Sequence, residues 1–242
     1  MRLFTLLSKA TFVSFVVFTL AGCSQKFNDV NDTMSLALFG DPDAQLQADD
    51  VTNLPYASIY ARIDEGPQAF MVLALAEHPT TFGNASSNNN ITNSNITPIE
   101  LKWLSSDGGM LITQSGRLVK TLNLPQGNVV STVSQQADPL TQGLHLPNTP
   151  RAWKRTLDWQ PGYHFGYTLT SLFSQQDNEV VIINEQPIET LRFNESVYVE
   201  QLDIRYQNQY WLEPTTGNVI KSRQKLAPGL PYIDITVLKP FS

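Results

Sequence analysis

From Tyr56 to its end, the chain is a series of short apolar segments separated by turn-forming residues. The segments are rich in Val, Ile, Thr, Tyr and Phe, which favour β-strands, and Gly, Pro, Asn and Asp stand between them. Ser106-Asp107-Gly108-Gly109 is the strongest hairpin turn of the series, and Asp64-Glu65-Gly66-Pro67 is another. Because no helical pattern lies between the segments, antiparallel pairing is favoured. The sequence therefore predicts an all-β, mainly antiparallel fold.

A sheet of this size has to limit its open edges. We expect it to curl into a partly open barrel, or to fold over itself as a sandwich. The predicted strands are 56–63, 68–77, 100–105, 110–113, 117–122, 151–159, 164–173, 179–184, 188–201, 208–213, 219–225 and 232–238. Residues 123–150 are predicted to be a long surface connection, and the Asn-rich residues 84–97 a mobile loop. We assign residues 49–242 to a single β domain.

Helical spacing occurs only before these strands. Within residues 23–48, apolar residues recur at spacings of three and four until Gly40-Asp41-Pro42 ends the pattern: Phe27, Val30, Met34, Ala37 and Leu38. This part of the chain is predicted to be a tether with a short N-terminal helix. A second helical turn is expected at Ala48–Asn53, because two aspartates stand in its first turn and Pro55 follows it.

The N-terminus has the pattern of a lipoprotein signal peptide. Arg2 and Lys9 precede an apolar run from Ala10 to Leu20, and this run leads into Leu20-Ala21-Gly22-Cys23. The run is shorter than the roughly 20 apolar residues that cross a bilayer. Residues 1–22 are therefore predicted to be removed by cleavage between Gly22 and Cys23. The alternative is an uncleaved anchor that ends in a buried cysteine.

Cleavage at this site would leave Cys23 as a lipidated N-terminus. We expect an S-diacylglycerol on its thiol and an N-palmitoyl chain on its amino group. Ser24 follows the cysteine, where an aspartate would favour retention in the inner membrane. We therefore predict a lipid anchor in the outer membrane, with the protein facing the periplasm.

The composition excludes several classes of partner and site. The formal net charge is −6, and the signal peptide holds two of the positive charges, so the body is acidic. An acidic body argues against binding nucleic acid or an anionic lipid surface. Cys23 is the only cysteine. Once it is acylated, no thiol remains for a disulfide, a cysteine-bound zinc ion or a nucleophile.

The chain contains none of the common catalytic or phosphate-binding motifs. It has no Gly-x-Ser-x-Gly, His-Glu-x-x-His or glycine-rich phosphate loop. The three histidines are far apart in the sequence and are read as ordinary turn or sheet residues: His78, His145 and His164. We therefore expect no metal site, no cofactor and no catalytic residues.

A glycosidase or lyase would need two positioned carboxylates. Four acidic residues lie on predicted strands: Asp158, Glu189, Glu195 and Glu200. Strand carboxylates are mostly solvated, and this is the favoured interpretation.

Aromatic residues gather between residues 153 and 167, and two interpretations remain open for them. Exposed rings would stack on sugar rings, which makes Trp153, Trp159 and Tyr163 candidate glycan-contact residues. Aromatic side chains are equally suited to a sheet core, and the core is favoured. Trp103 and Trp211 are interpreted as core anchors.

Basic residues stand in otherwise apolar strands: Arg117, Lys120, Arg223 and Lys225. The favoured interpretation is that they pair internally with Asp or Glu. The alternative is a small positive patch that faces an anionic polymer or the acidic groups of a partner.

Several segments, taken in order, resemble one family of bacterial lipoproteins. The match covers nearly the whole chain after the signal peptide, and its strength lies in the order of the motifs. The segments are Leu54-Pro55-Tyr56-Ala57-Ser58-Ile59-Tyr60, Trp103-Leu104-Ser105-Ser106-Asp107-Gly108, Gly116-Arg117-Leu118-Val119-Lys120-Thr121, Asp138-Pro139-Leu140, Tyr210-Trp211, Thr216-Gly217, Ser222-Arg223-Gln224 and Leu238-Lys239-Pro240. Together they resemble the YjbF/GfcB/YmcC group, which is tied to group 4 capsule and exopolysaccharide production in Gram-negative bacteria.

The resemblance implies an antiparallel β fold, an outer-membrane anchor and an outer-membrane β-barrel partner among other polysaccharide-export proteins. It supplies no catalytic residues. We therefore expect a non-enzymatic accessory lipoprotein of capsule or exopolysaccharide secretion or assembly, which contacts the polysaccharide or only its partner proteins. The alternatives are a periplasmic glycan-modifying enzyme, such as a lyase or deacetylase, and a structural envelope protein without polymer contact.

Overall fold

The computed structural model describes residues 42–78 and 98–241. Cys23, the helix predicted before Gly40 and the loop predicted at 84–97 lie outside these residues. From Asp43 onward, the described residues belong to one compact unit. In this part of the chain, no helix has the length and apolar character needed to span a membrane.

This unit is built mainly of β-strands, which confirms the predicted all-β class. Helix α3 spans Ala48–Asn53, as predicted, and a 3-10 turn, η1, spans Glu200–Leu202. The strands are β1 (Ser58–Ile63), β2 (Gln68–Glu77), β3 (Glu100–Ser105), β4 (Met110–Gln114), β5 (Arg117–Leu122), β6 (Asn128–Val133), β7 (Ala152–Gln160), β8 (His164–Gln175), β9 (Glu179–Ile183), β10 (Gln186–Val199), β11 (Ile204–Leu212), β12 (Val219–Lys225) and β13 (Tyr232–Lys239).

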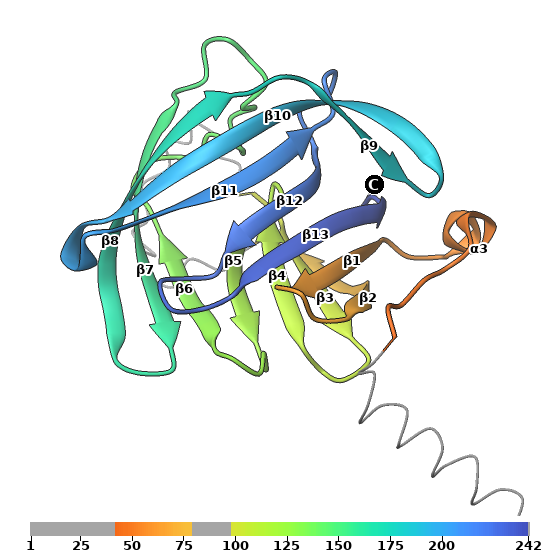
Figure 1. Cartoon of the computed structure of the whole chain (residues 1–242), viewed down its shortest axis with the longest axis horizontal. Coiled ribbons are helices and arrows are strands. Elements are labelled where there is room, and N and C mark those ends of the chain that lie inside the picture. Colours follow the sequence, from red (N-terminus) through yellow and green to blue (C-terminus); the bar gives the residue numbers. More distant parts are fainter. Residues whose placement is uncertain (1–41, 79–97, 242) are drawn as a thin grey trace, which may run out of the picture. The chain divides into compact units, whose positions relative to one another are not determined.

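The described strands pair antiparallel, and most neighbours in the sheet are also neighbours in the chain. The order is β5-β4-β3-β2-β1-β13-β12-β11-β10-β8-β7-β6, and β9 pairs only with the first part of β10. The first and last strands are joined, because β1 pairs with β13. The sheet curls until its two ends, β5 and β6, lie side by side (Figure 1). The fold is thus a nearly closed barrel, one of the two predicted forms.

Side chains connect β5 and β6, the two ends of the sheet. The Thr121 hydroxyl on β5 accepts a hydrogen bond from the Val129 N–H (3.0 Å) and lies 3.1 Å from Asn128 Oδ1, to which it donates. The Thr132 hydroxyl donates to the Val119 carbonyl (3.0 Å). These bonds satisfy backbone groups that an open sheet edge would expose. They form a seam along which the barrel closes.

Strand β6 corrects one sequence prediction. It lies within residues 123–150, where the sequence predicts only a surface connection. Pro and Gln stand on both sides of its six residues, so the composition of the whole stretch does not reveal the strand. The rest of the connection, residues 134–150, consists of turns and bends, and it buries Leu140 and Leu144.

Three apolar clusters fill or cover the barrel. The largest lies on the inner face, where it includes Ile59, Trp103, Leu157, Trp159 and Ile233. In the second, Leu140 and Leu144 pack against Trp153, Phe173, Phe193, Tyr210 and Leu212. In the third, Val51 of α3 and residues of the β9–β10 hairpin pack with Trp211 and Leu238. Tyr60 belongs to the third cluster and its neighbours Ile59 and Ala61 to the first, so these two clusters cover opposite faces of β1.

The seam provides a test of barrel closure. We predict that Thr121→Val lowers the free energy of unfolding by about 1–3 kcal/mol, because it leaves the buried Val129 N–H without its acceptor. Urea unfolding followed by tryptophan fluorescence measures the loss. The control is Thr236→Val on β13, since the Thr236 hydroxyl makes no hydrogen bond to the described residues. Equal losses in the two variants would contradict a stabilising role of the seam.

Candidate functional site

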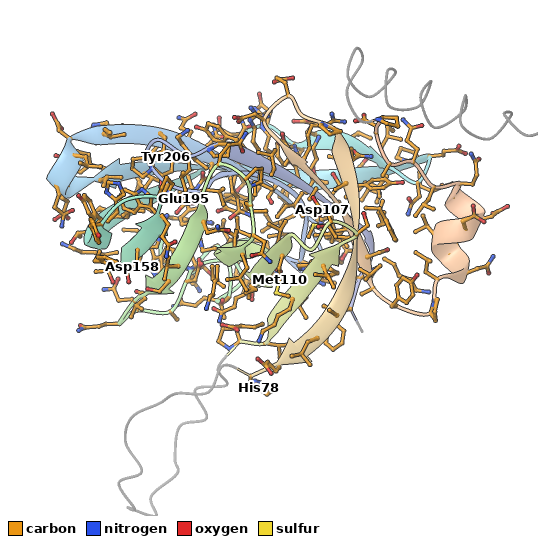
Figure 2. All side chains as sticks on the ribbon, turned by 90° about the horizontal axis from the view of Figure 1, so that it is seen from below. His78, Asp107, Met110, Asp158, Glu195 and Tyr206 are labelled. Carbon is orange, nitrogen blue, oxygen red and sulfur yellow. The ribbon has the colours of Figure 1, made fainter. Side chains whose placement is uncertain are left out.

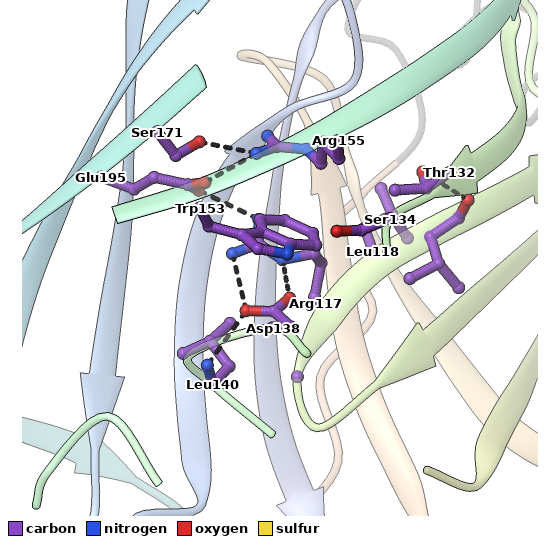
Figure 3. Close-up of polar contacts among 12 residues, drawn as sticks. Arg117, Leu118, Thr132, Ser134, Asp138, Leu140, Trp153, Arg155, Ser171 and Glu195 are labelled. Carbon is purple, nitrogen blue, oxygen red and sulfur yellow. Dashed lines mark hydrogen bonds and ion pairs between the residues drawn. The ribbon is translucent and has the colours of Figure 1, made fainter. Parts of the chain in front are cut away.

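The inner face of the barrel holds a buried carboxylate between two arginines. Glu195 on β10 accepts hydrogen bonds from Arg117 Nη1 on β5 (3.0 Å) and from Arg155 Nη1 on β7 (3.1 Å) (Figure 3). Glu195 is fully buried, and both arginines are nearly so. In Figure 2, Glu195 lies between the blue strands near the end of the chain and the green strands of its middle. The strand alternation that aims Glu195 inward also places Phe193 and Val197 in the interior.

Five further polar side chains join these three residues. We call the whole cluster the buried ion network: Glu195, Arg117, Arg155, Asp138, Ser171, Asn208, Tyr210 and Gln224. Ser171 on β8 accepts a hydrogen bond from Arg155 (2.6 Å). Asn208 on β11 donates its amide to Glu195 (2.8 Å). Arg155 and Glu195 therefore each have a hydrogen-bond partner in addition to their ion pair, as buried charges require.

Asp138 supplies the second negative charge of the network. It lies in the connection after β6 and forms an ion pair with Arg117 through Nε. Arg117 also donates from Nη1 to the Tyr210 hydroxyl (2.9 Å). Two arginines face two carboxylates, so the network is electrically balanced.

The electrostatics of the network fix the protonation state of its members. Burial by itself would raise the pKa of Glu195, but the charges of Arg117 and Arg155 outweigh it and hold this pKa well below its usual range. Burial opposes the charge on Arg117, yet Asp138 and Glu195 keep its pKa well above the ordinary value. Burial raises the pKa of Tyr210 well above its ordinary value. At neutral pH Glu195 and Arg117 are therefore ionised, and the Tyr210 hydroxyl is neutral.

The structure separates the three candidate glycan-contact residues. Trp153 and Trp159 are 5% and 2% exposed, whereas Tyr163, in the turn between β7 and β8, is 94% exposed. The tryptophans share the inner face of β7 with Arg155 and Leu157, because side chains alternate along a strand. The core interpretation is therefore confirmed for the tryptophans, and a shared exposed row of all three residues is wrong. Trp103 and Trp211 are also buried, as predicted.

Trp153 has a further role beside the network. The guanidinium groups of Arg117 and Arg155 each lie 4.5 Å from the centroid of its ring. Cation–π contacts of desolvated arginines contribute about 2 kcal/mol. Trp153 thus supports both arginines in the interior of the barrel.

Internal pairing, the favoured interpretation of the basic residues, is confirmed for both arginines that the sequence singled out. Arg117 pairs inside the barrel, and Arg223 pairs with Asp234 (2.7 Å) on the neighbouring strand. Lys225 donates to the carbonyl of Leu230 (2.8 Å), and Lys120 is exposed.

Among the strand carboxylates, the expectation of solvation is wrong for Glu195, because it occupies an inward position. Glu189 is exposed, and Glu200 pairs with Lys154 (3.0 Å) near the surface. Asp158 accepts hydrogen bonds from the Ser131 hydroxyl (2.8 Å) and the Gly166 N–H (2.6 Å).

His164 contributes to packing. The ring of His164 stacks on Trp159, with centroids 4.4 Å apart. Within residues 42–78 and 98–241, no three His, Cys, Asp or Glu residues gather in a way that could hold a metal ion.

A pocket of about 780 Å³ opens at one end of the barrel, where β4 turns into β5 and β11 turns into β12; we call it the end pocket. Its inner wall includes the apolar side chains Ile59, Leu101, Trp103, Leu140, Ile235 and Val237. Exposed or half-buried polar residues near the β9–β10 and β11–β12 turns line its mouth: Asn184, Gln186, Thr216 and Asn218. The volume is in the range of small-molecule sites, about 300–1,000 Å³.

The end pocket adjoins the buried ion network without opening into it. Gln224 Nε2 donates to the carbonyl of Gly116 and to the hydroxyl of Ser222, each at 2.9 Å, and both of these residues line the pocket. Gly116 has φ +82°, and a Cβ there would lie 2.4 Å from Cβ of Val219. A glycine is therefore required for this close approach. No sequence pattern indicates the pocket, because its wall comes from strands that are far apart along the chain.

Comparison with known proteins places these features in a wider group. A family model described as group 4 capsule polysaccharide lipoprotein gfcB, YjbF matches residues 31–238. The uncharacterized lipoproteins GfcB and YjbF of Escherichia coli (strain K12) are each 31% identical to the chain, with matches that cover 91% of it and 94% and 92% of the relatives. The crystal structure of the hypothetical lipoprotein YmcC from Escherichia coli (K12) matches with a TM-score of 0.66 and 30% identity, over 87% of this chain and 96% of that one. These matches confirm the resemblance seen in the sequence motifs.

Four of those motifs meet in the buried ion network. The segments 116–121, 138–140, 210–211 and 222–224 supply Arg117, Asp138, Tyr210 and Gln224, respectively. Glu195, Arg155, Ser171 and Asn208 lie outside the motifs, and sequence analysis did not predict their roles.

We predict that Glu195→Gln lowers the free energy of unfolding by about 3–5 kcal/mol, because it leaves a buried arginine charge without its partner. Chemical denaturation of the two proteins measures the difference. Glu189→Gln is the matched control on the same strand, since Glu189 is exposed; we expect a change within about 0.5 kcal/mol. A similar small change for both variants would contradict the network's importance for stability.

The depressed pKa of Glu195 predicts a specific acid sensitivity. Below about pH 4.5, the ordinary value, the unfolded chain binds a proton at Glu195 that the folded chain does not bind. The stability from this carboxylate is complete above that pH and is lost as the pH falls toward the lower folded pKa. Between pH 4.5 and 3, the wild type should therefore lose up to about 1.4 kcal/mol per pH unit more than Glu195→Gln. Parallel pH profiles of unfolding free energy would contradict this linkage.

Proposed function

Because the chain belongs to the family of group 4 capsule polysaccharide lipoproteins, we propose that it is a non-enzymatic accessory factor in capsule or exopolysaccharide secretion or assembly. It is held in the outer membrane by acylated Cys23, faces the periplasm and acts with an outer-membrane β-barrel partner. The observation that carries this proposal is the match over residues 31–238, which begins shortly after the predicted cleavage site between Gly22 and Cys23.

The burial of the ion network supports a structural role for Glu195, Arg117 and Tyr210, whose pKa values are strongly shifted. A general acid or base must come within hydrogen-bond reach of its substrate. The cavity beside Arg117 and Arg155 has a volume of about 20 Å³, which is room for about one water molecule. Glu195 is fully buried and its oxygens are already bonded to four other side chains of the network. Its ionisation therefore serves the architecture of the barrel.

The anchor supplies the physical basis of an accessory role. Each buried methylene of an acyl chain contributes about 0.8 kcal/mol, so the chains on Cys23 hold the protein at the membrane. Confinement to the membrane surface raises the effective concentration beside a membrane-embedded partner, and a weak contact then suffices. Either guidance of the polymer or help in assembling the partner is compatible with this arrangement.

Complementation tests the role of the anchor. In a strain without the gene, the wild-type chain should restore surface polysaccharide. A chain in which a cleavable secretory signal replaces residues 1–22 and Cys23 is changed to Ala should fold and accumulate in the periplasm. We predict that polysaccharide output then stays at the level of the deletion strain, because the protein is no longer concentrated beside its partner. Output is measured on the cell surface, and Glu189→Gln in the lipidated chain is the control. Full complementation by the soluble chain would reduce the anchor to a targeting signal.

The enzymatic alternative has its own test. Asp49 and Glu213 are the carboxylates that line the end pocket. Purified protein is incubated with the polysaccharide, and the product is analysed for shorter or deacetylated chains. Turnover that disappears in Glu213→Gln or Asp49→Asn would overturn the non-enzymatic assignment.

A further inference from the structure

We propose that the end pocket binds the acyl chain of a lipid whose polar head stays at the mouth. This inference concerns a ligand of the barrel itself and stands independently of the role in polysaccharide secretion. Three observations carry it: the apolar wall, the polar mouth and the packed floor of the pocket.

The wall of the pocket is suited to an alkyl chain. Ile59, Ile235 and Val237 come from the paired strands β1 and β13, Leu101 comes from β3, and Leu140 closes the side toward the connection after β6. Such side chains offer no hydrogen bonds to a ligand. Each methylene transferred from water to this wall would improve affinity about fourfold.

A sugar ring fits the same wall poorly. Each hydroxyl buried there without a partner would weaken binding about tenfold or more. The Trp103 ring, which could stack on a sugar, is 3% exposed, and its Nε1–H is bonded to the Thr113 hydroxyl (2.9 Å). Its Nε1–H is therefore already used within the barrel.

Exposed polar side chains lie at the mouth, where a lipid head would be. Asn184 belongs to the β9–β10 turn and Gln186 begins β10, whereas Thr216 and Asn218 belong to the β11–β12 turn. The Asn184 amide donates to the Leu238 carbonyl (3.1 Å) and the Thr216 hydroxyl to Glu213 (2.5 Å). The side-chain amides of Gln186 and Asn218 can donate and accept hydrogen bonds, which suits a hydroxyl-bearing head. The pocket thus has the polarity of an amphiphile: apolar inside and polar at the opening.

The floor is rigid because the buried ion network lies behind it. Gly116 and Ser222 are both fixed by Gln224, as described above. A pocket with a fixed floor needs little rearrangement to accept a ligand, which lowers the cost of binding.

Trp103 gives a local readout of occupancy, since it is the one tryptophan of the chain's four that lines the end pocket. The probe is a long-chain fatty acid brominated midway along its chain, added to the non-acylated Cys23→Ser chain. We expect saturable quenching of tryptophan fluorescence. Trp103→Phe should lose most of this quenching. Trp159→Phe should keep it, because Trp159 lies near the β7–β8 turn at the opposite end of the barrel.

A second variant tests the pocket without touching a tryptophan. Val237→Phe fills part of the cavity, and exclusion of two methylenes would weaken binding roughly fifteenfold. Its fold is checked by circular dichroism and by its unfolding midpoint. An absence of saturable quenching in the Cys23→Ser chain, equal affinity in Val237→Phe, or full quenching in Trp103→Phe would each overturn the proposal. Displacement of the probe by a soluble glycan fragment would identify a sugar as the ligand of the pocket, and this result would also overturn the proposal.

The acylated chain distinguishes two sources of the acyl group. If the protein's own anchor occupies the pocket, the acylated chain should not bind the brominated probe, whereas the Cys23→Ser chain should bind it. If a separate lipid is the ligand, both chains should bind the probe equally. Either result supports an acyl site. Because binding is measured on purified protein, its failure would be distinguishable from a failure of the complementation experiment.

Discussion

The ion pairs of Glu195 with Arg117 and Arg155 link parts of the barrel that its backbone ladders leave unconnected. Arg117 begins β5, at one end of the sheet order, whereas Arg155 and Glu195 lie on β7 and β10, near the other end. The Thr121 and Thr132 bonds close the seam along its length. The charges close it across the interior, and a sheet that curls in any other register would leave them unpaired.

The network selects one strand register more than it adds net stability to the fold. Desolvation of buried charges costs several kcal/mol per ion, and the pairs mainly offset this cost. A shift of β10 by one residue would turn Glu195 outward and leave Arg117 and Arg155 in the core without this carboxylate. We therefore attribute to the network the choice of one register among those that the apolar residues would tolerate. This explains why four motifs of the family converge on it.

The sequence predicted the class of fold and most strands, because β-branched segments and turn residues are local signals. It also predicted α3 and the internal pairing of Arg117. Strand β6 was missed because Pro and Gln outweigh its Val and Thr residues in the surrounding composition. The burial of Glu195 had a signal in its alternation with Phe193 and Val197, but its partner Arg117 is 78 positions away along the chain. Pairing over that distance is set by the curl of the sheet, so composition cannot reveal it. The end pocket was hidden for the same reason.

Asp138 connects the network to the shape of the end pocket. Its carboxylate holds the connection after β6 against Arg117, and Leu140, two residues later, both packs in the second apolar cluster and lines the pocket. One side of this barrel end is thus plugged by the connection, while the side formed by β1, β3 and β13 stays open. If Asp138 lost its partner, the plug and one wall of the pocket would loosen together. Barrel closure and the capacity to bind a ligand therefore depend on the same buried charges.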